Sequence, residues 1–198
     1  MHTIGTFFIC AVLAVFAQNA IFSRALGVSR LIKIVDDTSN AVTFGVLLCT
    51  IQLLAAPMGY LLNGLLMEFS YRREVRPLVL ILCSGVAYVL VRFLAQRSSR
   101  LSAKEEVLDM LPSATFNGAV LGAMLVSSTQ NYTLAQTLGF ALGTGVGYLL
   151  AVLLVNEAQR KLRSREVPGC FRGLPINLIY IGILAMAIYG FTGHMVAI

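Results

Sequence analysis

The stretch Leu111-Pro112-Ser113-Ala114-Thr115-Phe116-Asn117-Gly118-Ala119-Val120-Leu121-Gly122 lies inside an apolar run that is long enough to cross a membrane. Pro112 has no backbone N–H to give to a helix, and the side-chain amide of Asn117 needs hydrogen-bond partners in a region without water. Both residues are costly in lipid unless a protein group or a cavity receives them. We therefore expect a broken helix here and take Pro112 and Asn117 as the first candidates for a functional site.

The composition of the chain indicates a membrane protein. Hydrophobic residues make up 58% of the sequence and charged residues only 12%, whereas a soluble domain has about 25% charged residues. The apolar residues form runs that can cross about 30 Å of hydrocarbon at about 1.5 Å per helical residue. We predict an all-α integral membrane protein with six transmembrane helices, at Thr3–Ser23, Ala41–Met67, Pro77–Ala95, Val107–Ser128, Leu134–Asn156 and Leu174–Ile198.

Spans 1 and 4 are predicted to be broken helices. Span 4 contains Pro112, and span 1 loses its apolar character through Gln18, Asn19, Ser23 and Arg24. Non-helical backbone at membrane depth is tolerated where neighbouring protein covers it. Both segments are therefore expected to be covered by other helices of the protein.

The distribution of positive charge predicts the orientation. Twelve of the 15 Lys and Arg residues follow spans 1, 3 and 5, and the opposite side has only Arg72, Arg73 and Arg76. By the positive-inside rule, both termini lie outside a bacterial or archaeal plasma membrane. The net charge of +6 is explained by topology and anionic lipid headgroups, so no nucleic-acid partner is expected.

An internal repeat appears when the chain is compared with itself at an offset of 96 to 98 residues. Asn19 then matches Asn117, and Pro77 matches Pro175. Each half has three spans, so the halves enter the membrane from opposite sides and form an inverted repeat. We predict a single transmembrane domain, residues 1–198, with repeats at about 1–100 and 101–198. The segments around Asn19 and Asn117 are expected to meet near the midplane.

Three glycines of span 5 predict a packing seam. Gly139, Gly143 and Gly147 recur every four residues and share one helix face, where a neighbouring helix can approach closely. A pore lining is the less favoured interpretation of this row.

The sequence predicts no catalytic residues and no metal site. No carboxylate lies deep in a span, and no serine, histidine and aspartate fall together in one plausible pocket. The cysteines, Cys10, Cys49, Cys83 and Cys170, lack the spacing of a metal site. Autonomous hydrolytic or metal catalysis is therefore not expected.

Three motifs give a family resemblance. The segment Asn117–Gly122 follows a proline-bearing helix start, Val167-Pro168-Gly169-Cys170-Phe171-Arg172-Gly173 precedes span 6, and Gly190-Phe191-Thr192-Gly193 lies near the end. The chain resembles the six-span subunits of Rnf and Nqr complexes over nearly its whole length. The outward termini resemble the Rnf A and Nqr E subunits rather than their oppositely oriented homologues.

This resemblance implies a subunit of an ion-translocating redox complex. Rnf complexes move electrons between ferredoxin and NAD, and Nqr complexes move them from NADH to quinone, each coupled to Na⁺ or H⁺ transport. The implied partners are a homologous six-span subunit of the Rnf E or Nqr D type, other redox subunits and the lipid bilayer. The family pair holds a two-iron two-sulfur cluster at midmembrane with cysteines from broken spans 1 and 4.

The chain departs from the family pattern at the cluster ligands. Gly118 stands where the family has a cysteine after the asparagine, and Ala25–Ser29 is a shortened form of the cysteine-bearing segment of span 1. Gly118 therefore joins Pro112, Asn19 and Asn117 as a midplane candidate, and no cofactor is predicted in this chain.

Two functions remain open at this point. The first is a membrane subunit of an Rnf- or Nqr-type electron-transport complex, and the alternative is a cluster-free small transporter or assembly subunit with the same inverted-repeat fold. Asn19 and Asn117 either line the midplane site of such a protein or form interhelical hydrogen bonds that fix the bundle.

Overall fold

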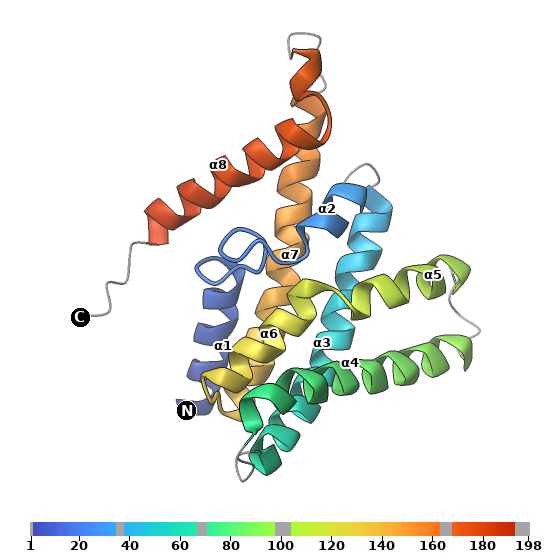
Figure 1. Ribbon diagram of the computed structural model, residues 1–198, viewed down its shortest axis with the longest axis vertical. Coiled ribbons are helices and arrows are strands. Elements are labelled where there is room, and N and C mark those ends of the chain that lie inside the picture. Colours follow the sequence, from blue (N-terminus) through green and yellow to red (C-terminus); the bar gives the residue numbers. More distant parts are fainter. Residues whose placement is uncertain (1, 35–37, 67–70, 98–103, 163–167, 193–198) are drawn as a thin grey trace.

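The computed structural model describes residues 2–34, 38–66, 71–97, 104–162 and 168–192. This part of the chain is helical and contains no strand (Figure 1). Its elements are α1 (His2–Val15), α2 (Val28–Ile34), α3 (Thr38–Leu66), α4 (Arg72–Arg97), α5 (Lys104–Thr115), α6 (Gly118–Thr129), α7 (Leu134–Leu162), the 3₁₀ turn η1 (Gly169–Phe171) and α8 (Leu174–Thr192).

Several helices have the length and composition of membrane spans. Within the described residues, three helices are long and apolar enough to cross a bilayer, at Asn40–Leu66, Arg72–Arg97 and Leu134–Gln159. The pair Glu105–Thr115 and Gly118–Thr129 passes the same test together, with a bend of 45°. Thr3–Val15 and Leu174–Gly190 are shorter apolar helices. The protein is therefore a helical, multi-pass membrane protein.

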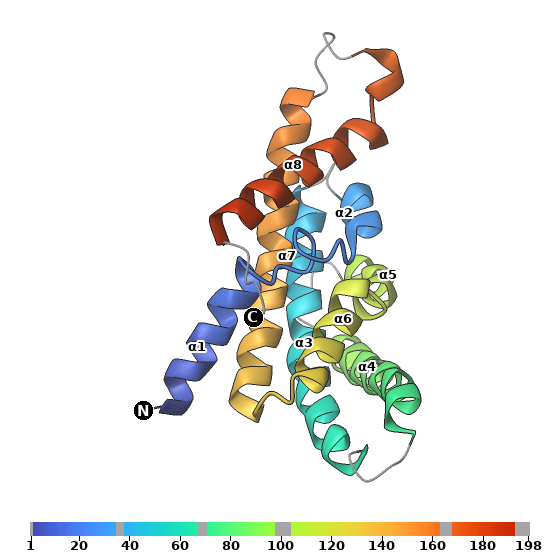
Figure 2. The ribbon, with the colours of Figure 1, turned by 60° about the vertical axis from the view of Figure 1, so that its left-hand side comes forward.

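Helix α7 is the centre of the bundle, with α1 on one side and α3 on the other (Figures 1 and 2). The backbone of Phe7 approaches Gly139 and that of Ala11 approaches Gly143, so α1 and α7 run parallel. Leu149 packs on Gly45 and Cys49 packs on Gly145, so α3 and α7 run antiparallel. Glycines on two faces of α7 thus allow two close neighbours.

Helix α6 runs parallel to α3 along another side of the bundle. The Gln52 amide nitrogen donates to the Ala119 carbonyl, and the Ser128 hydroxyl donates to the Asn63 side-chain oxygen, 2.8 Å away. The connection between α6 and α7 therefore lies at the same end of the bundle as the end of α3.

A helix break lies in each of the two segments for which the sequence predicted one, and the structure shows at which residues the helices end. Pro112 lies within α5, and the helix continues past it to Thr115. The break comes at Asn117, whose backbone is extended (φ −80°, ψ 139°) and whose side chain caps α6. A proline removes one donor and crowds the preceding turn, but the helix on either side of it can persist. In span 1 the helix ends at Val15 rather than at Ser23.

Helices α4 and α8 present apolar side chains to their surroundings. Leu82 of α4 and Met186 of α8 are both 69% exposed. Helix α8 lies across the bundle, away from α3 to α6, and packs mainly on α7 (Figures 1 and 2). Apolar faces of this kind suit contact with lipid chains or with other apolar helices. The predicted end of span 6, residues 193–198, lies outside the described residues.

Candidate functional site

Asn19 is fully buried in the break that follows α1. Its side-chain oxygen accepts from the backbone N–H of Ile21 (2.9 Å) and of Phe22 (3.3 Å). Its amide nitrogen donates to the carbonyls of Val15 (2.8 Å) and Gly147 (3.0 Å). One side chain therefore satisfies the end of α1, the start of the next turn and a carbonyl of α7.

Asn117 has the corresponding position in the second half of the chain. Its side-chain oxygen accepts from the backbone N–H of Ala119, at 2.9 Å, and so caps the first turn of α6. An asparagine is favoured at this position because its oxygen reaches a backbone donor that the helix leaves unpaired. Its amide nitrogen donates to the Tyr148 hydroxyl, at 3.4 Å.

Tyr148 connects the two breaks. Its side chain is fully buried, and its hydroxyl donates to the Gly27 carbonyl at 3.1 Å. The hydrogen bonds therefore run from Asn117 through Tyr148 to Gly27. The Asn19 amide reaches Gly147, the preceding residue of α7. The amide partners of both asparagines thus lie on one turn of α7, and the two amides do not bond to each other.

The two breaks also contact each other directly. A Cβ added to Gly118 would lie 3.4 Å from the backbone nitrogen of Gly27, and the Leu26 side chain packs on Gly122. Gly27 has a φ of +79°, a conformation that glycine adopts without strain. The midplane candidates Asn117 and Gly118 are therefore packed against the first break, while Pro112 lies more than a turn away within α5.

Along α7, the glycine seam receives α1. A Cβ on Gly139 or Gly143 would meet the backbone of α1, and one on Gly147 would lie 2.9 Å from the Asn19 amide nitrogen. The row of glycines thus brings α1 close enough for Asn19 to reach α7.

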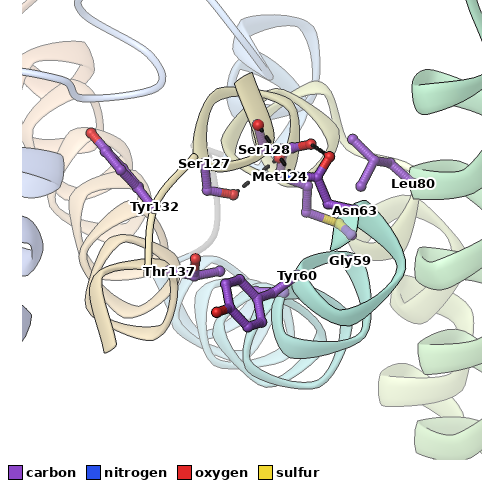
Figure 3. Close-up of a pocket in the computed structure, with 10 residues that line it drawn as sticks. Gly59, Tyr60, Asn63, Leu80, Met124, Ser127, Ser128, Tyr132 and Thr137 are labelled. Atoms are coloured by element: carbon purple, nitrogen blue, oxygen red, sulfur yellow. Dashed lines mark hydrogen bonds between the residues drawn. The ribbon is translucent and has the colours of Figure 1, made fainter. Parts of the chain in front are cut away.

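A second polar region lies between α3, α6 and α7. Two adjoining cavities share Ala56, Met124, Ser127 and Thr137 in their walls. In Figure 3, Asn63, Ser127, Ser128 and Thr137 surround the first cavity, whereas the Tyr132 hydroxyl points away from it. Tyr132 belongs to the connection between α6 and α7, and burial raises the pKa of its phenol above the ordinary value.

The residues near the breaks do not fit an iron-sulfur cluster. Such clusters are held mainly by cysteine thiolates, and no cysteine lies in residues 16–27 or at Phe116, Asn117 and Gly118. Gly118 faces Gly27 and Leu26, and Cys49 packs on Gly145 at the other face of α7. The described cysteines are free thiols in separate places.

Sequence reasoning missed several residues of both polar regions. Tyr148 could have been found from the sequence, because it is the only tyrosine in span 5 and directly follows the last glycine of the packing seam. Gln52 and Asn63 are eleven residues apart, which places them on one face of span 2. Leu26 and Gly27 gave no comparable signal, because their role depends on contact with a distant segment.

Comparisons with known proteins give a consistent result. Residues 7–195 match the model of the Rnf-Nqr subunit family, described as a membrane protein. The A-type subunit of an ion-translocating oxidoreductase complex from Syntrophotalea carbinolica is 30% identical over 180 residues, covering 91% of this chain and 93% of the relative.

Two further relatives represent both branches of this group. The A-type subunit of the Na⁺-translocating ferredoxin:NAD⁺ oxidoreductase complex from Acetobacterium woodii is 28% identical over 180 residues, with coverage of 91% and 93%. The E-type subunit of the Na⁺-translocating NADH-quinone reductase from Rhodopirellula baltica is 26% identical over 199 residues, with the same coverage. The similarity thus extends over nearly the full length of relatives of both kinds.

Proposed function

This chain belongs to the Rnf-Nqr subunit family of membrane proteins, and we propose that it is the A- or E-type membrane subunit of a complex that couples electron transfer to Na⁺ or H⁺ translocation. The observation that carries this proposal is the family match over residues 7–195. The relatives from Acetobacterium woodii and Rhodopirellula baltica, which match over nearly their full length, are named as subunits of a ferredoxin:NAD⁺ oxidoreductase and an NADH-quinone reductase. The subunit does not perform the redox reaction alone.

The complete chain has six membrane spans in this proposal, arranged as two inverted three-span repeats in a single domain, residues 1–198. Helix directions support it: α1 runs parallel to α7, and α3 runs antiparallel to α7 and parallel to α6. Spans 1, 2, 4 and 5 of a six-span chain have the same relative directions. The two buried asparagines, each bonded to a backbone N–H two residues further on, add local support.

The proposed location is the plasma membrane of a bacterium or archaeon, with both termini outside. The positive residues support this orientation, because all but Arg72, Arg73 and Arg76 follow odd-numbered spans. Attachment of a periplasm-dependent reporter to either terminus would test it. Reporter activity only with fusions in the connection between spans 3 and 4 would contradict it.

The midplane candidates have a positioning role in this proposal. Asn19, Asn117 and Gly118 hold the two breaks together against α7, and Pro112 shapes the helix that leads to the second break. No iron-sulfur ligand comes from this chain, because Gly118 and Gly27 offer no thiolate at the junction. Purified protein is therefore expected to contain no iron, as measured by elemental analysis.

The partners we propose are a homologous six-span subunit of the Rnf E or Nqr D type and the flavin- or iron-sulfur-bearing subunits of the complex. The test is affinity purification of the tagged full-length chain from its own membranes in a mild detergent, with mass spectrometry of the bound proteins. Recovery of a second six-span homologue together with redox subunits supports the proposal. A stable homodimer without redox subunits would instead indicate a small transporter.

A substitution in the assembled complex tests the site. Asn117→Leu removes the cap of α6 and the bond to Tyr148, so complex-linked ion transport is expected to fall. Blue-native electrophoresis first establishes that the complex assembles. Normal assembly with full ion transport would show that Asn117 has no functional role.

A further inference from the structure

One face of α3 lines a polar column of side chains between α3, α6 and α7. Gln52, Ala56, Gly59 and Asn63 follow one another at the spacing of a helix face and line the two adjoining cavities. The middle of this face has small residues, so there is space where larger side chains would fill it. Each cavity has a free volume of about 10 Å³, room for about one water-sized particle.

The deep end of the column contains an unpartnered oxygen. Gln52 is 1% exposed, and its amide nitrogen donates weakly to the Ala119 carbonyl at 3.4 Å. Its side-chain oxygen is buried and has no hydrogen-bond partner. A buried carbonyl-type oxygen without a donor costs about 1–3 kcal/mol unless a water or a cation binds it. This oxygen therefore points to a ligand in the column.

More hydroxyl and amide oxygens line the column between Gln52 and the C-terminal end of α3. Ser127 and Thr137 belong to the walls of both cavities, and Asn63 and Ser128 are paired at the far end of the first. Figure 3 shows these groups gathered around one space. Gln52 and Asn63 are eleven residues apart, or about 16 Å along the helix axis. This distance is about half of the hydrocarbon thickness of about 30 Å.

The chemistry of the column suits a monovalent metal cation. Among the described residues that line the two cavities, none is acidic, basic or a histidine. Hard oxygen atoms of amides and hydroxyls bind hard cations, and the lack of carboxylates disfavours divalent ions, which need more negative charge. No side chain at the deep end can hold a transferable proton near pH 7.

We propose that this column is a hydrated half-channel for Na⁺, leading from the membrane face at the C-terminal ends of α3 and α6 to an oxygen site at Gln52. The inference rests on the proposed function, which supplies the driving reaction. In the proposed orientation this face is the outer one, so the column is the exit path of the pumped ion.

Transport in everted membrane vesicles that contain the whole complex tests the column. Uptake of ²²Na⁺ is driven by NADH or reduced ferredoxin, in wild type and in Gln52→Met, which keeps side-chain size but removes the carbonyl oxygen. The initial rate is expected to fall about tenfold, because the ion loses one oxygen partner on its path. A wild-type rate in Gln52→Met would overturn the proposal.

A matched pair on α7 controls for general damage. Thr137→Val removes a hydroxyl from the column, whereas Thr144→Val removes a buried hydroxyl that bonds to the Phe140 carbonyl outside the two cavities. Slower uptake in Thr137→Val than in Thr144→Val is expected. Equal rates in the two variants, or formation of a pH gradient by a pump that moves no ²²Na⁺, would overturn the proposal.

The controls separate this inference from the proposed function. If removal of the chain leaves donor-driven ²²Na⁺ uptake unchanged, the proposed function is wrong, and water access then tests the column by itself. In a background without native cysteines, Ser127→Cys is expected to bind Ag⁺ added at the outer face, a thiol-reactive cation small enough for the cavities, and Thr144→Cys is not. Equal binding by both, or by neither, would exclude a hydrated column.

Discussion

The break after α1 extends over twelve residues, 16–27, whereas the break between α5 and α6 takes only Phe116 and Asn117. Both use a buried asparagine whose side-chain oxygen accepts, at 2.9 Å, from the backbone N–H two residues further on. Both asparagines also donate to neighbouring residues of α7. The two halves therefore use the same asparagine hydrogen bond at their helix breaks, but the first break contains many more residues than the second.

The longer break depends more on its asparagine. The Asn19 side chain makes four hydrogen bonds and the residue is fully buried, while the Asn117 side chain makes two and the residue is 4% exposed. A segment without regular helix has more backbone groups to satisfy in lipid. We conclude that the first break depends more on its asparagine side chain, and that the second is a bend which the adjoining helices largely support.

The largest expected effect tests this difference. Asn19→Leu leaves the backbone N–H groups of Ile21 and Phe22 without their partner and removes the bond to the Gly147 carbonyl, and we expect a loss of about 4 kcal/mol in the free energy of unfolding. Asn117→Leu loses fewer partners, and we expect about 2 kcal/mol. Unfolding in mixed detergent micelles measures both values. Equal losses would show that the two breaks depend equally on their asparagines.

The next effect concerns the contact between the breaks. Gly27→Ala is expected to cost about 3 kcal/mol, because it adds strain at positive φ and places a Cβ against Asn117 and Tyr148. Gly173→Ala is the matched control, since Gly173 has a φ of +86° and its Cβ would meet nothing within 4 Å. The same unfolding measurement compares the two variants. If both variants lose the same free energy of unfolding, the close contact of Gly27 with Asn117 and Tyr148 adds nothing to the cost.

A smaller effect is expected from the link through α7. Tyr148→Phe removes the hydroxyl that joins Asn117 to the Gly27 carbonyl, and we expect a cost of about 1 kcal/mol. A double-mutant cycle with Asn117→Ala measures the coupling directly. Additive losses would mean that the 3.4 Å contact between the two side chains contributes nothing.

The sequence predicted the helical membrane class and the approximate positions of the helices, because long apolar runs carry that information locally. It did not predict where helices end within a span. Pro112 was the strongest local signal, yet α5 continues through it, and the helix stops at Asn117. The stop depends on the partners that Asn117 finds on α6 and α7.

Tertiary contacts also explain which residues of the candidate site the sequence did not predict. Asn19, Asn117 and Gly118 were found from the repeat and the family motifs. Tyr148 and Gly27 were missed because the bond between them joins residues 121 positions apart in the sequence. The oxygen of Gln52 becomes notable only once its surroundings are known to offer no donor.

The smallest expected effect is at Gly118, where the two breaks come closest. A Cβ there would lie 3.4 Å from the Gly27 nitrogen, an ordinary contact, so Gly118→Cys should change the free energy of unfolding by less than about 1 kcal/mol. The purified Gly118→Cys protein should still contain no iron, because one thiolate cannot hold a cluster and Leu26 and Gly27 offer no second one. Elemental analysis and visible absorption measure this. Stoichiometric iron would mean that ligands from elsewhere can reach the junction of the two breaks, and that this junction serves more than packing.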